Sequence, residues 1–150
     1  MTTSSDDLET LIQGTWWLLS REDYTKDGQK RIDPVLGPDP VAILVYTKEY
    51  FAAQFMKKDR SLDSIVQATN AGQNNTAAIG GYDAYFGTYQ IEKKSNQVAH
   101  TLIGSINPAN IGMTVYRNLF VEGNTLTIKL DTTTHQGEPV TRTLTWRKIS

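Results

Sequence analysis

Short segments of alternating apolar and polar residues, or of β-branched and aromatic residues, make up most of this chain. Glycine, asparagine and proline separate them, which is the pattern of antiparallel strands joined by turns. The pattern predicts eight strands, at residues 15–22, 41–47, 50–56, 84–92, 98–105, 113–121, 125–131 and 141–148. We therefore expect one all-β domain over residues 1–150, either an up-and-down antiparallel barrel or a sandwich.

An amphipathic segment at residues 5–12 precedes the first strand. Ser5 can cap a helix there, and Leu8, Leu11 and Ile12 lie on one face of that helix. We expect this aliphatic face to plug one end of a barrel.

The longest connection, residues 57–82, separates the third predicted strand from the fourth. Residues 61–71 can form a helix with its apolar residues on one side. Residues 71–81, AGQNNTAAIGG, are rich in glycine and asparagine, which predicts a flexible segment that can act as a lid.

Composition narrows the function mainly by exclusion. The chain has 15 Lys and Arg against 16 Asp and Glu, a net charge of −1, so no basic excess points to nucleic acid or to an anionic membrane. Cysteine is absent, which excludes disulfides, thiolate metal sites and cysteine nucleophiles. His100 and His135 lie on different segments and no phosphate or dinucleotide motif is present, so neither a metal nor an organic cofactor is expected.

The distribution of apolar residues also bears on location. No apolar run approaches the roughly 20 residues that cross a membrane. The first ten residues, MTTSSDDLET, lack the basic and apolar regions of a signal peptide. We therefore expect a cytoplasmic protein that does not bind membranes.

Alternation along each strand predicts which side chains face the interior of a barrel. The strands at 41–47 and 50–56 are apolar on both faces, and there we choose Tyr46, Ala52, Gln54 and Met56 as inward. Polar residues fix the outer face of the later strands. The inward residues expected there are Tyr85, Gly87, Tyr89, Ile91, Val98, His100, Leu102, Met113, Val115, Arg117, Leu119, Leu126, Ile128, Leu130, Leu144 and Trp146.

Polar side chains distinguish this expected interior from an ordinary packed core. An unpaired buried polar group costs about 1–3 kcal/mol, so several on one inner surface favour a pocket with a few orienting groups. The ligand-binding residues predicted in this way are Tyr46, Gln54, Tyr85, Tyr89, His100, Arg117 and Trp146.

Arg117 is the most informative of these residues, because a buried guanidinium needs a partner. The candidates are Glu22 on the first strand, an interior water or a ligand oxygen. Arg117 could instead lie at the rim of the barrel and reach water. His100 could likewise be a core histidine that holds a tyrosine hydroxyl, and the tyrosine hydroxyls could reach water at the rim.

Four segments, in order along nearly the whole chain, resemble a family of small microbial and fungal lipocalin-like domain proteins. They are residues 14–20 (GTWWLLS), residues 44–47 (LVYT) with Tyr50 and Ala53-Gln54, residues 84–89 (AYFGTY) and residues 144–147 (LTWR). The resemblance implies an eight-stranded up-and-down barrel, with Trp16 at the closed end and Arg147 packed across its ring. It implies no single function, because this barrel hosts carriers and enzymes alike.

Two positions depart from the family's pattern. Such proteins often carry paired histidines on the middle strand, where this chain has Ala99-His100. They often have an aromatic residue in the following turn, where this chain reads NPANI at residues 107–111. Any role that the second histidine and the aromatic residue have in the family is therefore not assigned to this chain.

Three functions remain open from the sequence. The first is binding of one small, mainly apolar, oxygenated molecule in the lumen. The second is a cofactor-independent isomerase, cyclase or dehydratase acting on a polyketide- or terpenoid-like intermediate of secondary metabolism, with His100, Arg117 and Tyr89 as catalytic candidates. The third is a barrel that acts through its outer surface, for example as a homodimer, since Tyr116 and Phe120 are expected to point outward.

Two further side chains are assigned by the same alternation. Ser105 and His100 are five residues apart on one strand, which predicts opposite faces and argues against a serine–histidine pair. Trp17 should face outward, away from Trp16, either beneath the long connection or at a subunit contact.

Overall fold

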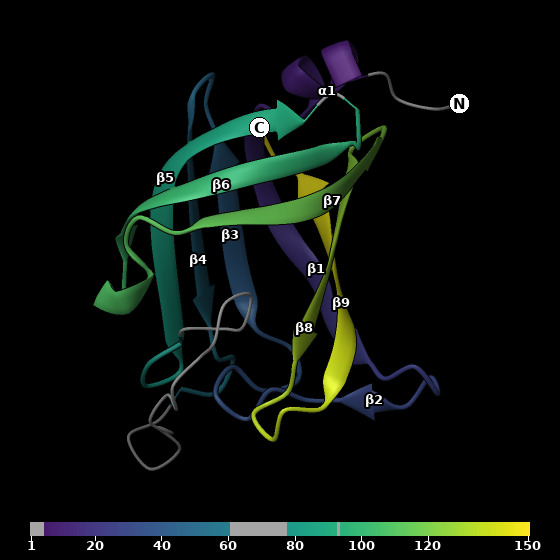
Figure 1. Ribbon diagram of the computed structural model, residues 1–150, viewed down its shortest axis with the longest axis vertical. Coiled ribbons are helices and arrows are strands. Elements are labelled where there is room, and N and C mark those ends of the chain that lie inside the picture. Colours follow the sequence, from purple (N-terminus) through teal and green to yellow (C-terminus); the bar gives the residue numbers. More distant parts are fainter. Residues whose placement is uncertain (1–4, 61–77, 93) are drawn as a thin grey trace.

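The computed structural model describes residues 5–60, 78–92 and 94–150 (Figure 1). The helix expected at 61–71 and residues 71–77 of the expected lid lie outside the described residues. The elements are α1 (Ser5–Leu11), β1 (Gly14–Tyr24), β2 (Lys30–Arg31), β3 (Val41–Tyr46), β4 (Tyr50–Met56), β5 (Tyr82–Glu92), β6 (Gln97–Ser105), the 3₁₀ helix η2 (Pro108–Asn110), β7 (Thr114–Glu122), β8 (Thr125–Thr133) and β9 (Pro139–Lys148).

Eight of these strands close into an antiparallel barrel, which confirms the predicted all-β fold. From β3 to β9 each strand pairs with the next along the chain, as expected for successive hairpins. Closure comes from β1, which pairs with β3 on one side and with β9 on the other. The two-residue β2 pairs only with the end of β1, at Asp23 and Tyr24.

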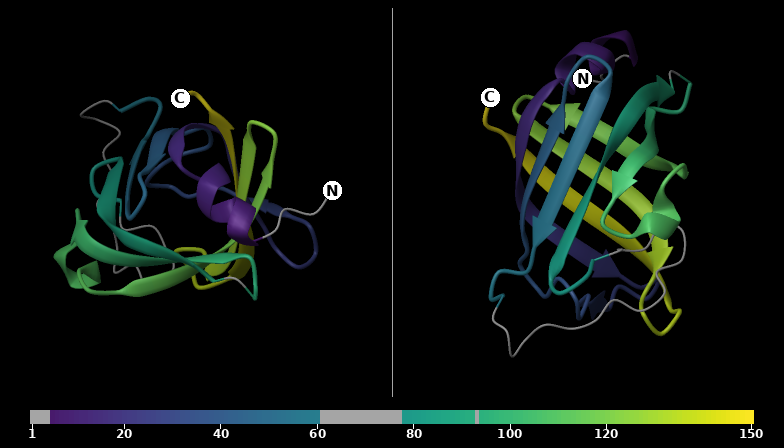
Figure 2. Two further views of the ribbon diagram at one scale, coloured as in Figure 1. Left: turned by 90° about the horizontal axis from the view of Figure 1, so that it is seen from above. Right: turned by 90° about the vertical axis from the view of Figure 1, so that its left-hand side faces the viewer.

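One end of the barrel is covered by α1 (Figure 2). Leu8 and Ile12 are buried there, and the Trp16 indole Nε1 donates a hydrogen bond to the Ile12 carbonyl at 2.9 Å. The cation that lies over the Trp16 ring is Lys148, whose Nζ is 5.6 Å from the ring centroid. The role expected for Arg147 is therefore wrong: Arg147 pairs with Trp17 and is exposed on the outer face.

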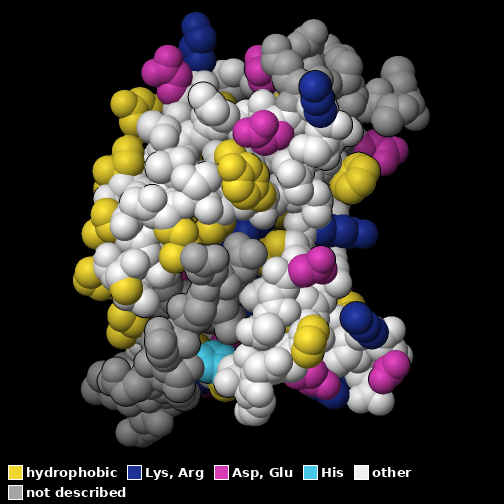
Figure 3. Space-filling view, viewed as in Figure 1, with side chains coloured by type: hydrophobic (Ala, Val, Ile, Leu, Met, Phe, Trp, Pro, Cys, Tyr) yellow, Lys and Arg dark blue, Asp and Glu magenta, His cyan; other side chains and the backbone are white. Residues whose placement is uncertain are grey.

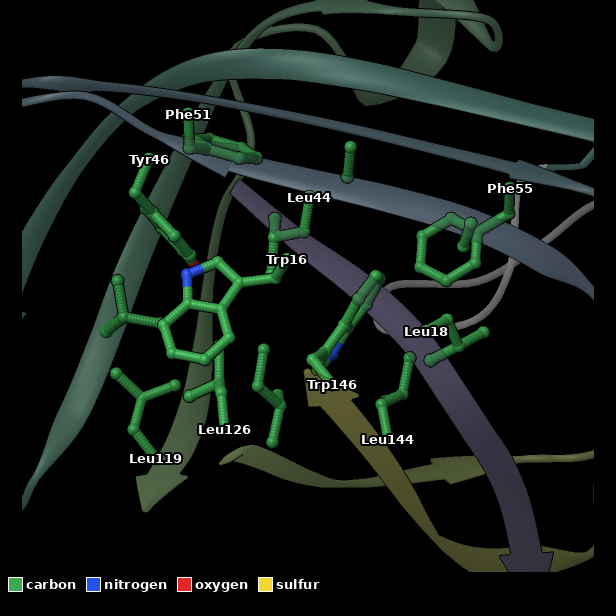
Figure 4. Packing of buried hydrophobic residues seen from close by; sticks show 14 of the residues in the cluster. Trp16, Leu18, Leu44, Tyr46, Phe51, Phe55, Leu119, Leu126, Leu144 and Trp146 are labelled. Carbon is green, nitrogen blue, oxygen red and sulfur yellow. The ribbon is translucent and has the colours of Figure 1, made fainter. Parts of the chain in front are cut away.

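The core is a continuous cluster of buried aromatic and aliphatic side chains inside the barrel (Figure 4). Trp16 and Trp146 both point inward, and Phe55 lies edge-on to Trp146 with ring centroids 5.7 Å apart. Complete burial of one such side chain stabilises the fold by roughly 1.5–3 kcal/mol. Because α1 and Trp16 occupy one end, free space in the interior lies toward the other end.

The inward choice on β4 is corrected by the structure. Phe51, Ala53 and Phe55 are buried, whereas Gln54 is exposed and Ala52 and Met56 are partly exposed. The reason is the tight turn at Lys48-Glu49, which places Tyr46 of β3 opposite Phe51. Residues directly opposite each other in an antiparallel pair share a face, so an inward Tyr46 requires an inward Phe51.

A β-bulge interrupts the alternation of β1. Leu18 pairs with Trp146 and Ser20 pairs with Thr145, so Leu19 is an extra residue with no partner on β9. Leu19 is 53% exposed. Every residue that follows it faces the side opposite to the one that simple alternation predicts.

A second irregularity shifts the register between β5 and β6. Phe86 pairs with Gly104 and Gly87 pairs with Leu102, which leaves Ile103 as the extra residue of β6. Ile103 is exposed on the outer surface. The end of β6 therefore also changes face relative to its start.

Candidate ligand-binding cavity

A cavity lies inside the barrel, toward the end opposite α1. It comprises about 850 Å³ of empty space, open solvent at its mouth included, and the centre of a water molecule can move through about 90 Å³ of it. Its apolar walls are Leu36, Leu44, Ala53, Phe55, Leu102, Met113, Val115, Ile128, Leu130, Leu144 and Trp146. Its polar walls are Arg21, Asp83, Tyr85, His100, Ser105, Asn110, Arg117 and Arg142.

The bulge in β1 turns Arg21 and Asp23 toward the interior. Asp23 accepts two hydrogen bonds from Arg142 of β9, Nε to Oδ1 at 2.8 Å and Nη2 to Oδ2 at 2.9 Å, and both side chains are only 6% exposed. Glu22, suggested as the partner of Arg117, instead faces outward and accepts a hydrogen bond from the Tyr24 hydroxyl. That suggestion is wrong because the extra residue Leu19 reverses the faces of the residues after it.

Arg21 is held by the loop that follows β2. Its Nη2 lies 3.4 Å from Oδ2 of Asp33, and the two side chains are 6% and 2% exposed. Asp33 also accepts a hydrogen bond from the Val35 backbone at 2.8 Å, which fixes the turn that buries Leu36 against the cavity. Burial, and secondarily Arg142, lower the pKa of Arg21 to about 10, while Asp33 opposes the shift, so Arg21 stays cationic at neutral pH.

Arg117 of β7 lines the cavity, as the alternation predicts. Its Nη1 donates to the Tyr116 carbonyl at 3.0 Å. Burial lowers the pKa of Arg117, and the positive charge of Arg142 lowers it further. The guanidinium therefore stands in a poorly solvated position, where an electron-rich oxygen would interact favourably with it.

His100 of β6 is buried and tightly held. Its Nε2 lies 2.6 Å from the Tyr46 hydroxyl, and its ring stacks on Phe51 with centroids 4.0 Å apart. Burial, with a smaller effect of Arg117, lowers the pKa of His100 to about 3. His100 is therefore neutral at physiological pH. His100 therefore matches the expected core histidine that holds a tyrosine hydroxyl. It does not match a general acid or base, which needs a pKa near neutral.

Tyr85 and Trp146 bring two further donors to the cavity wall. Burial, assisted by the charge of Asp83, raises the pKa of Tyr85 to about 12, so its phenol is neutral and can donate. Trp146 is 1% exposed, and its indole Nε1 has no hydrogen-bond partner among the described residues.

The remaining predicted ligand-binding residues do not line the cavity. Tyr46 lies behind His100, and burial raises its pKa well above the ordinary tyrosine value. Tyr89 donates its hydroxyl hydrogen bond to the Thr47 carbonyl at 2.6 Å, away from the cavity residues. Gln54 lies on the outer face, where it accepts a hydrogen bond from the Tyr82 hydroxyl. Of the three catalytic candidates, His100 and Arg117 line the cavity, whereas Tyr89 pairs with His100 across β5 and β6 but does not line it.

Several polar wall residues were missed from the sequence. Asp83 lies one residue before the strand start that was predicted, and Arg142 would follow from extending the alternation of Leu144 and Trp146 backward. Arg21 and Ser105 carry no such signal, because each follows a bulge. The expectation that Ser105 and His100 lie on opposite faces is wrong for this reason, since both line the cavity.

Among the residues that the structure describes, no three His, Asp or Glu side chains gather in a way that could hold a metal ion. In the same part of the chain, no helix is long and apolar enough to cross a membrane.

A closed up-and-down antiparallel barrel, covered at one end by a helix and holding a mostly apolar cavity, defines the class of small-molecule-binding β-barrels. The model of the lipocalin-like domain family matches residues 13–149. The chain therefore belongs to the lipocalin-like domain family, as the four sequence segments indicated. No curated protein matches the chain.

Proposed function

We propose that this protein binds one small, mainly apolar molecule carrying an oxygen atom, inside the barrel. The observation that carries the proposal is a mostly apolar cavity whose walls include buried and half-buried hydrogen-bond donors. Arg117, Tyr85 and Trp146 line the same space as Phe55 and Leu102. Small-molecule sites typically combine such walls with a few placed polar groups.

The polar groups are held in place by contacts within the protein. Asp23 fixes Arg142 through two hydrogen bonds, and Asp33 lies within ion-pair distance of Arg21. Two of the three arginine side chains in the cavity wall therefore need little reorganisation when a ligand enters. Binding then loses less conformational entropy, which favours affinity.

The test uses two neighbouring alanines of β4 that face opposite sides. Ala53 lines the cavity, whereas Ala52 faces outward. We expect Ala53→Leu to fill part of the cavity and weaken binding of the fluorescent probe 1-aminoanthracene by about tenfold or more. The loss of apolar contact worth two methylene groups, at about 0.8 kcal/mol each, already corresponds to tenfold. Ala52→Leu should leave the affinity unchanged. Equal affinities for both variants and the parent protein would argue against binding in the lumen.

A second candidate function, a cofactor-free isomerase, cyclase or dehydratase, is supported by Asp83. Asp83 is the one carboxylate among the described residues that line the cavity, and Arg117 and Tyr85 line the same cavity. A carboxylate can take a proton from the carbon next to a ketone while the electron pair moves onto the carbonyl oxygen, which Arg117 can stabilise. Asp83 replaces His100 and Tyr89 as the preferred base in this proposal.

Deuterium exchange separates the enzyme from the carrier. In D₂O, an enolising cavity should exchange the methyl protons of 2-acetylnaphthalene faster than buffer does, and Asp83→Asn should abolish the excess rate while circular dichroism confirms the fold. A carrier should bind the ketone and leave its methyl group protonated. Biosynthetic genes beside this one would favour the enzyme and a role in secondary metabolism.

The outer face of β5, β6 and β7 supports a proposed contact with a second copy of this chain. Tyr116 and Phe120 are 53% and 61% exposed, as the sequence predicted for an outer contact surface, and Phe86 and Ile103 are exposed farther along the same outer face. Hydrophobic side chains gather over β5 and β6 in Figure 3. Between Tyr82 and Glu92, and along the outward positions of β6 and of β7 up to Phe120, the outer face carries no charged side chain. A two-fold contact therefore brings no like charges together.

Sedimentation equilibrium tests this contact. We expect a dimer that Tyr116→Lys converts to a monomer, because a two-fold interface would then hold two opposed lysines. Thr125→Lys, on the exposed face of β8, should leave the dimer intact. This surface would be rejected if the parent protein is monomeric at a concentration on the order of 100 micromolar, or if its dimer is insensitive to Tyr116→Lys.

A further inference from the structure

The buried indole of Trp146 narrows the chemistry of the ligand. An indole N–H can only donate, and the Nε1 of Trp146 meets no acceptor within the described part of the chain although the residue is 1% exposed. The other buried indole, that of Trp16, donates to the Ile12 carbonyl at 2.9 Å. A buried donor without a partner costs about 1–3 kcal/mol, so an acceptor placed against Trp146 recovers that free energy.

The described walls of the cavity that holds Trp146 carry three guanidinium groups and one carboxylate. Arg21, Arg117 and Arg142 line the cavity, and Asp83 is the single carboxylate among its described lining residues. The neutral phenol of Tyr85 adds another donor. Phe55 lies between the two aromatic donors, with its centroid 5.7 Å from Trp146 and 6.3 Å from Tyr85. An acceptor group near Phe55 can therefore be approached by more than one donor.

Trp146 is part of the cavity wall, and because its Nε1 has almost no accessible surface, neighbouring side chains must shift slightly before an acceptor reaches it. It extends from β9 into the interior beside Leu144, and Phe55 stands edge-on to it (Figure 4). Both side chains belong to the cavity wall. An aromatic or otherwise planar ligand body can pack on Phe55 while an oxygen attached to it reaches the indole N–H.

We propose that the ligand presents a carbonyl oxygen, of a ketone, ester or carboxylate, to the Nε1–H of Trp146 while its apolar body packs against Phe55. This inference rests on the proposed function and names the chemical class of the ligand. It makes Trp146 a specificity-determining residue, because a hydrocarbon of the same shape would leave the indole unsatisfied.

A matched pair of probes tests the inference. In 2-acetylnaphthalene a carbonyl oxygen occupies the place of the methylene group in 2-isopropenylnaphthalene, and the two molecules are otherwise alike in shape. We expect calorimetry to show about tenfold tighter binding of the ketone, the ratio that corresponds to one satisfied donor. In ¹H–¹⁵N spectra, the Trp146 indole signal should move downfield with the ketone and hardly move with the hydrocarbon.

Two conservative variants serve as test and control. Trp146→Phe keeps an aromatic ring and removes the N–H, so the affinity ratio of the two probes should fall to about one. Trp17→Phe changes an indole on the outer face, 37% exposed, and should leave the ratio unchanged. If Trp146→Phe does not fold, the indole shift in the parent protein still decides. A third probe, 2-naphthoate, separates the sources: affinity above that of the ketone, lost in Arg117→Gln, identifies a carboxylate.

Each remaining outcome has a distinct meaning. If neither naphthalene probe binds, the proposed function fails and this inference fails with it. If both bind equally and the Trp146 signal stays in place, the inference is overturned while the proposed function stands.

Discussion

His100 illustrates how surroundings decide the chemistry of a single residue. A histidine on the inner face of a barrel is an obvious candidate acid or base from the sequence. Here the ring stacks on Phe51, and its Nε2 is hydrogen-bonded to the Tyr46 hydroxyl. Burial keeps the ring neutral, so its contribution is to orient the aromatic cluster between the α1 end and the cavity.

Protonation of His100 should make the stability of the fold depend on pH. Its pKa is about 3 in the folded protein against 6.5 in an unfolded chain. Between these values the unfolded chain carries a proton on His100 that the folded protein lacks. The free energy of unfolding should therefore fall as the pH falls below 6.5, by about 1.4 kcal/mol per pH unit, or about 2–3 kcal/mol between pH 7 and 4.5.

Urea unfolding of the parent protein and of His100→Gln, at several pH values, measures this contribution. The glutamine can still accept a hydrogen bond from Tyr46 but does not titrate. Effects of the other titratable groups occur in both proteins, so the difference between the two curves isolates His100. Parallel curves down to pH 4.5 would show that His100 is not buried in a neutral form.

At the scale of elements, the pairing of β1 with β9 closes the barrel. The same two strands supply Arg21 and Arg142 to the cavity wall. The bulge at Leu19 turns Asp23 inward, where Arg142 of β9 meets it. Bulges often re-aim side chains next to functional sites, and the register shift at Ile103 does the same for Ser105. The two irregularities of the sheet therefore both add polar groups to one cavity.

Loss of the Asp23 carboxylate should be costly. Asp23→Asn leaves the Arg142 guanidinium buried without its counter-charge, and breaking a buried pair in this way costs about 3–5 kcal/mol. The control is Glu138→Gln, which removes the carboxylate from an exposed pair with Arg31 whose Nε–Oε1 distance is 2.6 Å. That change should have little effect on stability.

Chemical denaturation monitored by tryptophan fluorescence provides the comparison. The arrangement of charges described above is contradicted if Asp23→Asn unfolds at the same denaturant concentration as Glu138→Gln. Restoration of stability by an apolar pair at positions 23 and 142 would be consistent with a buried ion pair between Asp23 and Arg142, because well-packed apolar residues can replace such a pair.

The sequence was sufficient for the eight barrel strands, because alternation and turn residues repeat along the whole chain. The pattern alone left a barrel or a sandwich open, and the resemblance to the lipocalin-like family favoured the barrel. The sequence also placed Tyr85, His100, Arg117 and Trp146 on the inner surface. It failed for Arg21 and Ser105, since one inserted residue reverses a strand's faces and leaves no mark in composition. The error at Gln54 was avoidable, because a two-residue turn already couples the faces of β3 and β4.

At the scale of the whole molecule, the barrel is asymmetric along its axis. The end covered by α1 is filled by Trp16, Tyr46 and their neighbours, and the cavity occupies the other part, beneath Leu36 of the loop at residues 33–40. A rigid, hydrogen-bonded wall therefore surrounds a space whose apolar and donor groups are already placed. The proposed binding of a small carbonyl-bearing molecule would use these groups.

A crystal structure of the protein grown with 2-acetylnaphthalene tests that account most directly. It should show the naphthalene rings inside the barrel against Phe55, with the ketone oxygen at about 2.9 Å from Nε1 of Trp146, the usual hydrogen-bond length. The account is contradicted if the interior is closed by side chains, or if the ketone lies only on the outer surface while water occupies the cavity.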